Sequence, residues 1–176
     1  MRALPWTLPL AALCVTLSSP VRADMLKVGD TFPAWTLPDH TGKTVSSADL
    51  AGKTYLLWFF PKAMTSGCTK EGQGLRDRND AFTSLSLIIY GVSFDAPATN
   101  AEFVKQENFP FALLSDQDQT LASKVGAKMF AVPLAKRVSY LVGPDGKVLK
   151  VYDSVDPATH AAEVERDVRA LAPPKG

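Results

Sequence analysis

The chain has 176 residues, of which 21% are charged and 46% hydrophobic, and its formal net charge is +1. These values are ordinary for a soluble globular protein that forms one compact domain. Because neither charge sign is in excess, the composition gives no sign of a surface selected for nucleic acid.

The first 23 residues differ in kind from the rest. Arg2 is followed by an apolar segment over residues 3–17, and Val21-Arg22-Ala23 ends the stretch with a small residue. This is the layout of a secretory signal peptide, and its apolar part is short for a membrane span. We therefore predict a signal peptide over 1–23 and export to the periplasm, with no stable membrane association after cleavage. An uncleaved anchor is the alternative.

Residues 24–176 are predicted to form a single domain, with a formal charge of −1 once Arg2 and Arg22 are removed. Cleavage after Ala23 would also remove Cys14 and leave Cys68 as the only thiol. Structural disulfides need pairs of cysteines, so a single thiol in an oxidising compartment is a candidate reactive residue.

The first half of this domain contains two predicted buried strands. Glycine and proline punctuate residues 25–52, which favours short strands and turns, including a hairpin turn at "HTGKTV". The continuous apolar run "TYLLWFF" over 54–60 predicts a central strand buried on both faces. A helical pattern follows over 69–85, with candidate core contacts at Leu75, Phe82 and Leu85. "LSLIIYGVSF" over 85–94 predicts the second strand.

The second half continues the alternation of helices and strands. A helix, a strand and a short helix are predicted over residues 97–109, 111–116 and 119–127. Asn100 is the expected cap of the first of these helices. "RVSYLVGPDGKVLKVYDSV" over 137–155 predicts a hairpin, and an amphipathic helix over 157–171 begins at a proline. This order predicts an α/β fold, with a mixed central sheet flanked by helices after an N-terminal strand extension.

Cys68 lies where the strand gives way to a helix, in "FFPKAMTSGCTKEGQGLRD". Free backbone N–H groups and the positive end of a helix favour the thiolate there, and the thiolate is the nucleophile. Thr65 can donate its hydroxyl to the sulfur or to an oxygen that the sulfur attacks, and Pro61 fixes the exit from the strand. The alternative is a small buried hydrophobe, which free cysteines usually are. The small, polar neighbours of Cys68 argue against a core position.

The spacing Pro61-x-x-x-Thr65-x-x-Cys68 resembles the active-site motif of peroxiredoxins. The wider stretch is similar to the subfamily known as peroxiredoxin Q or bacterioferritin comigratory protein. Three further blocks resemble that subfamily in the same order: "VGDTFPAWTLPDHTGKTVSSADLAGK", "FALLSDQD" and "KRVSYLVGPDGKV". The resemblance implies a thioredoxin-like fold and a thiol-dependent peroxidase that reduces hydrogen peroxide and organic hydroperoxides, without a cofactor or a metal.

By this resemblance, Cys68 is the peroxidatic cysteine, which attacks the O–O bond and becomes a sulfenic acid. Thr65 would hydrogen-bond the peroxide and the sulfur. Arg137 would stabilise the thiolate and the transition state, because a guanidinium stays charged and presents several donors. Glu71 matches the acidic residue of the family's "CTKE" and is expected to orient the site. A solvated charge is the alternative for Arg137, and an exposed first-turn glutamate for Glu71; Lys136 is interpreted as a solvated charge.

The chain departs from the subfamily at three positions. Many members carry a resolving cysteine five residues after the peroxidatic one, where this chain has Gln73. We therefore predict a one-cysteine form, resolved by an external thiol of a thioredoxin-like or glutaredoxin-like protein or of a small molecule. Met64 and Ser66 replace the Asp and Pro often found in the active-site loop, which leaves the preferred peroxide open.

Two other functions remain open. A disulfide oxidoreductase shares the fold but usually needs a C-x-x-C motif, which Cys68 lacks. A peroxide-responsive redox sensor or thioredoxin-like binding module would use Cys68 without efficient turnover. Among the remaining candidates, His40 and His160 are interpreted as surface residues without metal-ligand neighbours, and Trp35 and Trp58 as core. The apolar loop over 129–135 is expected to pack, with a hydroperoxide tail or a partner as alternative ligands.

Overall fold

The computed structural model describes residues 24–171, so the predicted signal peptide, Cys14 and the last five residues lie outside the described part. Its central sheet consists of β3 (Thr54–Phe59), β4 (Leu87–Ser93), β5 (Ala112–Ser115), β6 (Val138–Val142) and β7 (Val148–Tyr152). The strand order is β5-β4-β3-β6-β7. β3, β4 and β5 run parallel, whereas β6 is antiparallel to both β3 and β7. The predicted mixed sheet and the predicted final hairpin are confirmed.

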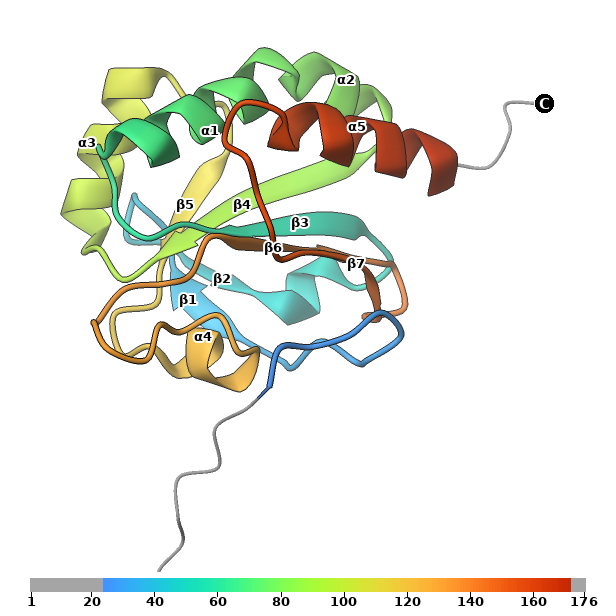
Figure 1. The fold of residues 1–176 in the computed structure, drawn as a ribbon, viewed down its shortest axis with the longest axis horizontal. Helices are drawn as coiled ribbons and strands as arrows, with labels where there is room; N and C mark the ends of the chain where they lie inside the picture. Colours follow the sequence, from blue (N-terminus) through green and yellow to red (C-terminus); the bar gives the residue numbers. More distant parts are fainter. Residues whose placement is uncertain (1–23, 172–176) are drawn as a thin grey trace, which may run out of the picture.

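Two layers cover the faces of this sheet (Figure 1). One layer consists of the helices α1 (Ser66–Asp77), α2 (Asn79–Ser84), α3 (Pro97–Glu107) and α5 (His160–Leu171). The other contains the hairpin β1 (Thr36–Pro38) and β2 (Thr44–Ser46), the 3-10 helix η1 (Ser47–Leu50) and the short helix α4 (Thr120–Lys124). None of the described helices is both long and apolar enough to cross a membrane.

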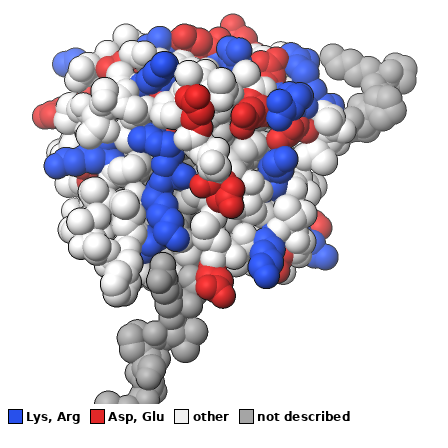
Figure 2. Space-filling model, in the orientation of Figure 1, with Lys and Arg blue, Asp and Glu red and all other residues white. Residues whose placement is uncertain are grey.

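β3 shows why the sheet needs both layers. Leu56 and Trp58 pack into the core on the α1 side, whereas Leu57 and Phe59 pack into the core beneath the β1–β2 hairpin. Successive side chains of a strand point to opposite faces, so an unbroken apolar run has to be covered twice. Lys and Arg are interspersed with Asp and Glu on the face of the molecule that Figure 2 shows.

The helix boundaries differ from the prediction by up to three residues, and one predicted helix is divided. The helix predicted over 69–85 is two helices, α1 and α2, separated at Arg78, whose φ of −106° and ψ of 9° leave helical geometry. Leu75 and Phe82 are both buried on either side of this break, so the apolar spacing continues across it and does not reveal it. The last helix begins at His160, because Asp156 forms a turn there and accepts the N–H groups of Ala158 and His160.

The predicted cap at Asn100 is wrong. α3 begins at Pro97, and Asn100 lies one turn inside it, fully buried. Its side-chain amide accepts from the Ser93 hydroxyl at 3.3 Å and donates to the Ser115 hydroxyl at 3.0 Å. The residue is therefore used to join the carboxyl ends of β4 and β5, where a buried amide finds its partners.

Gly72→Ala is expected to destabilise the protein, although alanine is the better helix former. A Cβ atom at Gly72 would lie 2.4 Å from Phe109 and 3.0 Å from Trp58, and Phe109 is itself stacked on Phe111. Overpacking typically costs about 1–3 kcal/mol, against a gain of about 1 kcal/mol in helix propensity. Denaturant unfolding should therefore show a lower free energy of unfolding.

Gly74→Ala, on the same helix, is the matched control. Its Cβ would lie 3.4 Å from the Cβ of Ala161, which is ordinary contact. This variant should be as stable as the parent or more stable, by up to about 1 kcal/mol. Equal stability of the two alanine variants would contradict the packing of Phe109 against α1.

Candidate active site

Cys68 is the third residue of α1, directly after the loop that leaves β3. The first backbone hydrogen bond of the helix runs from the N–H of Thr69 to the carbonyl of Thr65, at 2.8 Å. The N–H groups of Ser66, Gly67 and Cys68 therefore precede the helical ladder and favour negative charge at this end. The location predicted for the thiol, at the start of a helix, is confirmed.

The expectation that Cys68 avoids the core is wrong, because its side chain is fully buried. Its neighbours in the chain are more exposed, but Cys68 shares the inward face of α1 with Glu71, Gly72 and Leu75. Residues three, four and seven positions apart line one face of a helix. Local composition therefore did not predict the burial, whereas helical spacing could have done so.

Arg137 joins Cys68 and Glu71 through one guanidinium group. Its Nη2 lies 3.4 Å from Cys68 Sγ, and its Nη1 donates to the Glu71 carboxylate. Arg137 immediately precedes β6, the strand beside β3, which brings residues 69 positions apart together. Burial tends to lower the pKa of Arg137, but Glu71 and Cys68 together raise it above its usual value. The alternative of a solvated charge is wrong.

Gly67 makes the approach of Arg137 possible. A Cβ atom at this position would lie only 3.0 Å from Arg137 Nη2. Real Cβ contacts are rarely so tight, so a side chain at Gly67 would press on the guanidinium beside the sulfur. The small residue before Cys68 therefore has a steric role in the site, which its sequence neighbourhood alone does not show.

Glu71 is a buried carboxylate and not an exposed first-turn glutamate. Burial raises the pKa of Glu71 to about 7, although the charge and the hydrogen bond of Arg137 oppose the shift. The nearby indole N–H of Trp58 is a smaller influence that lowers this pKa. It acts without a hydrogen bond of normal geometry, because neither Trp58 Nε1 nor Glu71 Oε1 has such a partner within residues 24–171. Glu71 thus orients Arg137 through Oε2 and leaves Oε1 without a hydrogen bond.

Thr65 and Pro61 shape the loop but do not contact the sulfur through a hydrogen bond in the described structure. Thr65 is exposed, and its hydroxyl donates to the carbonyl of Lys62 at 2.9 Å. With its hydrogen used there, the hydroxyl presents its lone pairs to a donor such as a peroxide O–H. Pro61 is half-buried directly after the apolar run. The Asp95 carboxylate, absent from the sequence prediction, anchors this loop by accepting the N–H of Ala63 at 2.9 Å.

The interpretation of His160 as a surface residue is wrong. Its side chain is fully buried, with Nε2 2.9 Å from the Ser139 hydroxyl and 3.7 Å from Glu71 Oε1. Burial and the nearby charge of Arg137 lower the pKa of His160 to about 4, so the imidazole is neutral at ordinary pH. The sequence carried a signal, because His160, Val164 and Val168 recur at the spacing of one helix face.

Other predicted residues have mixed outcomes. Trp35 and Trp58 are core residues, as expected. His40 is half-buried, and its Nδ1 accepts from the backbone N–H of Leu113 at 3.4 Å. Lys136 is not simply solvated, because its Nζ donates to the carbonyl of Gly126. In the loop over 129–135, the packing prediction is wrong at the tip, where Met129, Phe130 and Val132 are exposed.

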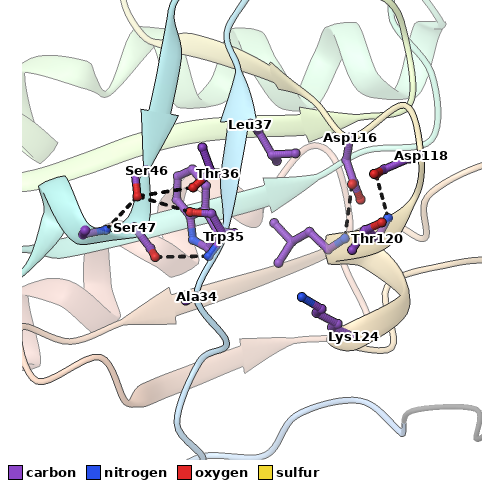
Figure 3. Close-up of a pocket in the computed structure, with 12 residues that line it drawn as sticks. Ala34, Trp35, Thr36, Leu37, Ser46, Ser47, Asp116, Asp118, Thr120 and Lys124 are labelled. Atoms are coloured by element: carbon purple, nitrogen blue, oxygen red, sulfur yellow. Dashed lines mark hydrogen bonds between the residues drawn. The ribbon is translucent and has the colours of Figure 1, made fainter.

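A separate pocket of about 320 Å³ lies on the other side of the sheet, between β1, η1 and α4 (Figure 3). Its two carboxylates cap the start of α4: Asp116 accepts hydrogen bonds from the N–H groups of Leu121 and Ala122, and Asp118 accepts one from the N–H of Thr120. The pocket thus contains the capping groups of a helix and no thiol. Within residues 24–171, no group of three or more His, Cys, Asp and Glu side chains is arranged to hold a metal ion.

The chain is similar to known proteins over most of its length. The AhpC/TSA family model matches residues 28–151. Peroxiredoxin Bcp of Escherichia coli K12 is 36% identical over 141 residues, which make up 77% of this chain and 90% of that protein. The crystal structure of peroxidoxin BcpB from Mycobacterium tuberculosis has a TM-score of 0.78 at 33% identity, covering 84% of this chain and 99% of that one.

A further solved structure is the bacterioferritin comigratory protein of Xanthomonas campestris, described in connection with its alkyl peroxide reduction activity. It has a TM-score of 0.77 and 26% identity, covering 85% of this chain and all of that one. The segment that the family model matches includes Cys68, Glu71 and Arg137.

Proposed function

Because this chain belongs to the AhpC/TSA family and is a thiol-dependent peroxidase of the Bcp peroxiredoxin type, we propose that Cys68 is its peroxidatic cysteine. The predicted thioredoxin-like fold is confirmed by the peroxiredoxin structures that it resembles. One observation carries the assignment of Cys68: its sulfur lies at the start of α1, 3.4 Å from a guanidinium that a buried carboxylate holds in place.

The reaction begins with attack of the Cys68 thiolate on one oxygen of the peroxide. An S–O bond forms and the O–O bond breaks, so the sulfur is oxidised to a sulfenic acid and the peroxide is reduced. The leaving hydroxide or alkoxide takes up a proton and departs as water or an alcohol. The N–H groups at the start of α1 and the Arg137 guanidinium stabilise the negative charge as it moves from sulfur to the leaving oxygen.

Each supporting residue has a separate role in this proposal. Arg137 contacts the sulfur and the developing oxyanion with its several donors. Thr65, whose hydroxyl hydrogen bonds to Lys62, accepts the O–H of a bound peroxide. Pro61 fixes the path from β3 into the loop, and Glu71 orients Arg137. Hydrogen peroxide and organic hydroperoxides are the proposed substrates, in line with the alkyl peroxide activity named for the Xanthomonas campestris protein.

An external thiol is the proposed reductant, from a thioredoxin-like or glutaredoxin-like protein or a small molecule. The position of a resolving cysteine on α1 is occupied by Gln73, whose side-chain amide donates to Glu107 at 2.7 Å. Arg76 adds a bond to the backbone carbonyl of Glu107 at 2.7 Å. Both contacts fasten α1 to α3. The external thiol attacks the sulfenic sulfur and releases water, and a second thiol then cleaves the mixed disulfide.

One equivalent of hydrogen peroxide is expected to give a monomer that carries one added oxygen, with no disulfide within the chain. Excess peroxide without thiol should add a second oxygen and abolish activity, because a sulfinic acid is not reduced by ordinary thiols. Intact-mass spectrometry of the exported protein, quenched at increasing peroxide ratios, measures both steps. A loss of two hydrogens without added oxygen would contradict the one-cysteine assignment.

We also propose that the protein is exported to the periplasm and cleaved after Ala23. The support is the charged start, the apolar segment over 3–17 and the small residue at position 23. The expected result is a mature N-terminus at Asp24 in protein recovered from the cell envelope fraction, read by intact mass. A full-length soluble species in the cytoplasm would contradict this proposal, and a full-length membrane-bound species would favour the uncleaved anchor.

A further inference from the structure

A chain of buried polar groups extends from the active site into the core. Arg137 links Cys68 to Glu71, and the free oxygen of that carboxylate, Oε1, faces His160 Nε2 at 3.7 Å. His160 Nε2 in turn lies 2.9 Å from the Ser139 hydroxyl. Glu71, His160 and Ser139 are all fully buried, so water cannot replace these partners without a change of structure.

Two periodicities bring this chain of groups together. Cys68 and Glu71 lie three residues apart on the inward face of α1. Arg137 directly precedes β6 and Ser139 is its second residue; residues two apart in a strand share one face of the sheet. His160 is the first residue of α5, the helix that packs beside α1. The site thus depends on three elements, of which α5 contributes only the imidazole.

The surroundings of His160 select its tautomer. The Arg137 guanidinium, which donates to Oε2, favours the ionised form of Glu71 against the effect of burial, and an ionised Oε1 favours a hydrogen, not a lone pair, on the nitrogen that faces it. Nε2–H can donate to Ser139 and present its positive end to the carboxylate. Nδ1 is then the acceptor nitrogen, and it has no hydrogen-bond partner within the described residues. A lone pair without a partner is less costly in a core than an N–H group without one.

We propose that His160 is a positioning residue of the peroxidase reaction: its Nε2–H, bound to Ser139, lies 3.7 Å from Oε1, attracts the Glu71 carboxylate electrostatically without a hydrogen bond, and thereby helps to hold Arg137 against Cys68. This inference rests on the proposed role of Cys68. Oε2 is bound to Arg137, so a rotation of the carboxylate would move the guanidinium that also contacts the sulfur. The ring of Tyr152, edge-on to the imidazole with centroids 5.0 Å apart, keeps His160 from rotating away.

The test compares His160→Phe with His160→Gln. Phenylalanine keeps a planar aromatic ring, somewhat larger than the imidazole, without a polar atom, whereas the glutamine amide can place an N–H group near the position of Nε2. The measurement is the second-order rate constant of Cys68 oxidation by hydrogen peroxide, from rapid quenching and intact mass, with thermal unfolding in parallel. His160→Phe should lower the rate constant by about tenfold or more, as expected when a supporting partner is lost, and His160→Gln should restore most of it.

A double-mutant cycle with Glu71→Gln separates positioning from packing. If His160 acts through the carboxylate, His160→Phe should cause little further loss in the Glu71→Gln background. An undiminished rate constant in folded His160→Phe, or an equal loss in both backgrounds, would overturn the inference and leave the proposed function standing. If the parent protein itself forms no sulfenic acid at Cys68, the proposed function fails and the inference fails with it.

Discussion

Cys68→Ser is expected to abolish peroxide reduction and to leave the fold intact. A serine hydroxyl is not ionised at working pH and cannot supply the nucleophile that a thiolate supplies. The substitution exchanges sulfur for oxygen at a fully buried position without changing the shape of the side chain greatly. The donors around it, Arg137 Nη2 among them, can still hydrogen-bond the hydroxyl.

The measurement for Cys68→Ser is peroxide consumption in the presence of excess thiol, with circular dichroism and thermal unfolding as checks of the fold. The parent, freshly reduced, is the positive control, and parent alkylated at Cys68 should match the variant. If Cys68→Ser still consumes peroxide at the parent's rate, the thiol is not the nucleophile. The redox-sensor alternative predicts instead that the parent itself oxidises without efficient turnover.

Arg137→Ala is expected to lower the rate constant for Cys68 oxidation by about a hundredfold, the usual cost of losing one preorganised donor to developing negative charge. The fold should survive, because Glu71 can become neutral. Burial already raises the pKa of Glu71, and Arg137 is the main group that opposes this shift. Without Arg137, the Glu71 carboxyl therefore takes up a proton more readily, and no unpaired charge stays buried.

Two variants sharpen the test of Arg137. Arg137→Lys keeps the charge but cannot contact Glu71 and Cys68 with two nitrogens of one planar group, so its rate constant should fall between those of Arg137→Ala and the parent. Lys136→Ala removes a neighbouring charge whose Nζ is bound to the Gly126 carbonyl, and should leave the rate constant near the parent's. Equal rate constants for Arg137→Ala and Lys136→Ala would place Arg137 outside the reaction.

The sequence predicted the parts of the fold that depend on local pattern. The apolar run of β3 and the alternating strands around Gly143-Pro144-Asp145-Gly146 carry their periodicity in adjacent residues, and both elements formed as predicted. The resemblance supplied Cys68 and Arg137, and the structure brings their side chains together. What the sequence did not predict are pairings across the sheet and between helices.

His160 and Asn100 illustrate that limit. Both are polar residues near the start of a helix, where exposure or capping is the usual role. Both are buried, because each forms a hydrogen bond with a residue of another element. For His160 that partner is Ser139, and for Asn100 it is Ser115. Nothing within either helix specifies the register of the strand that supplies the partner hydroxyl. The positions of such groups therefore follow from tertiary packing, not from propensity.

The position of Trp58 provides the protein with an optical reporter. Its indole lies against α1 one turn beyond Cys68 and acts on the Glu71 carboxylate, whereas Trp35 lies in the core on the other face of the sheet. In the proposed reaction, conversion of the Cys68 thiolate to a sulfenic acid changes the charge in the cluster that contains Trp58 and not in the cluster that contains Trp35. The fluorescence emission of Trp58 should therefore follow the redox state of the site, over a constant background from Trp35, and peroxide reactions could be followed without a dye.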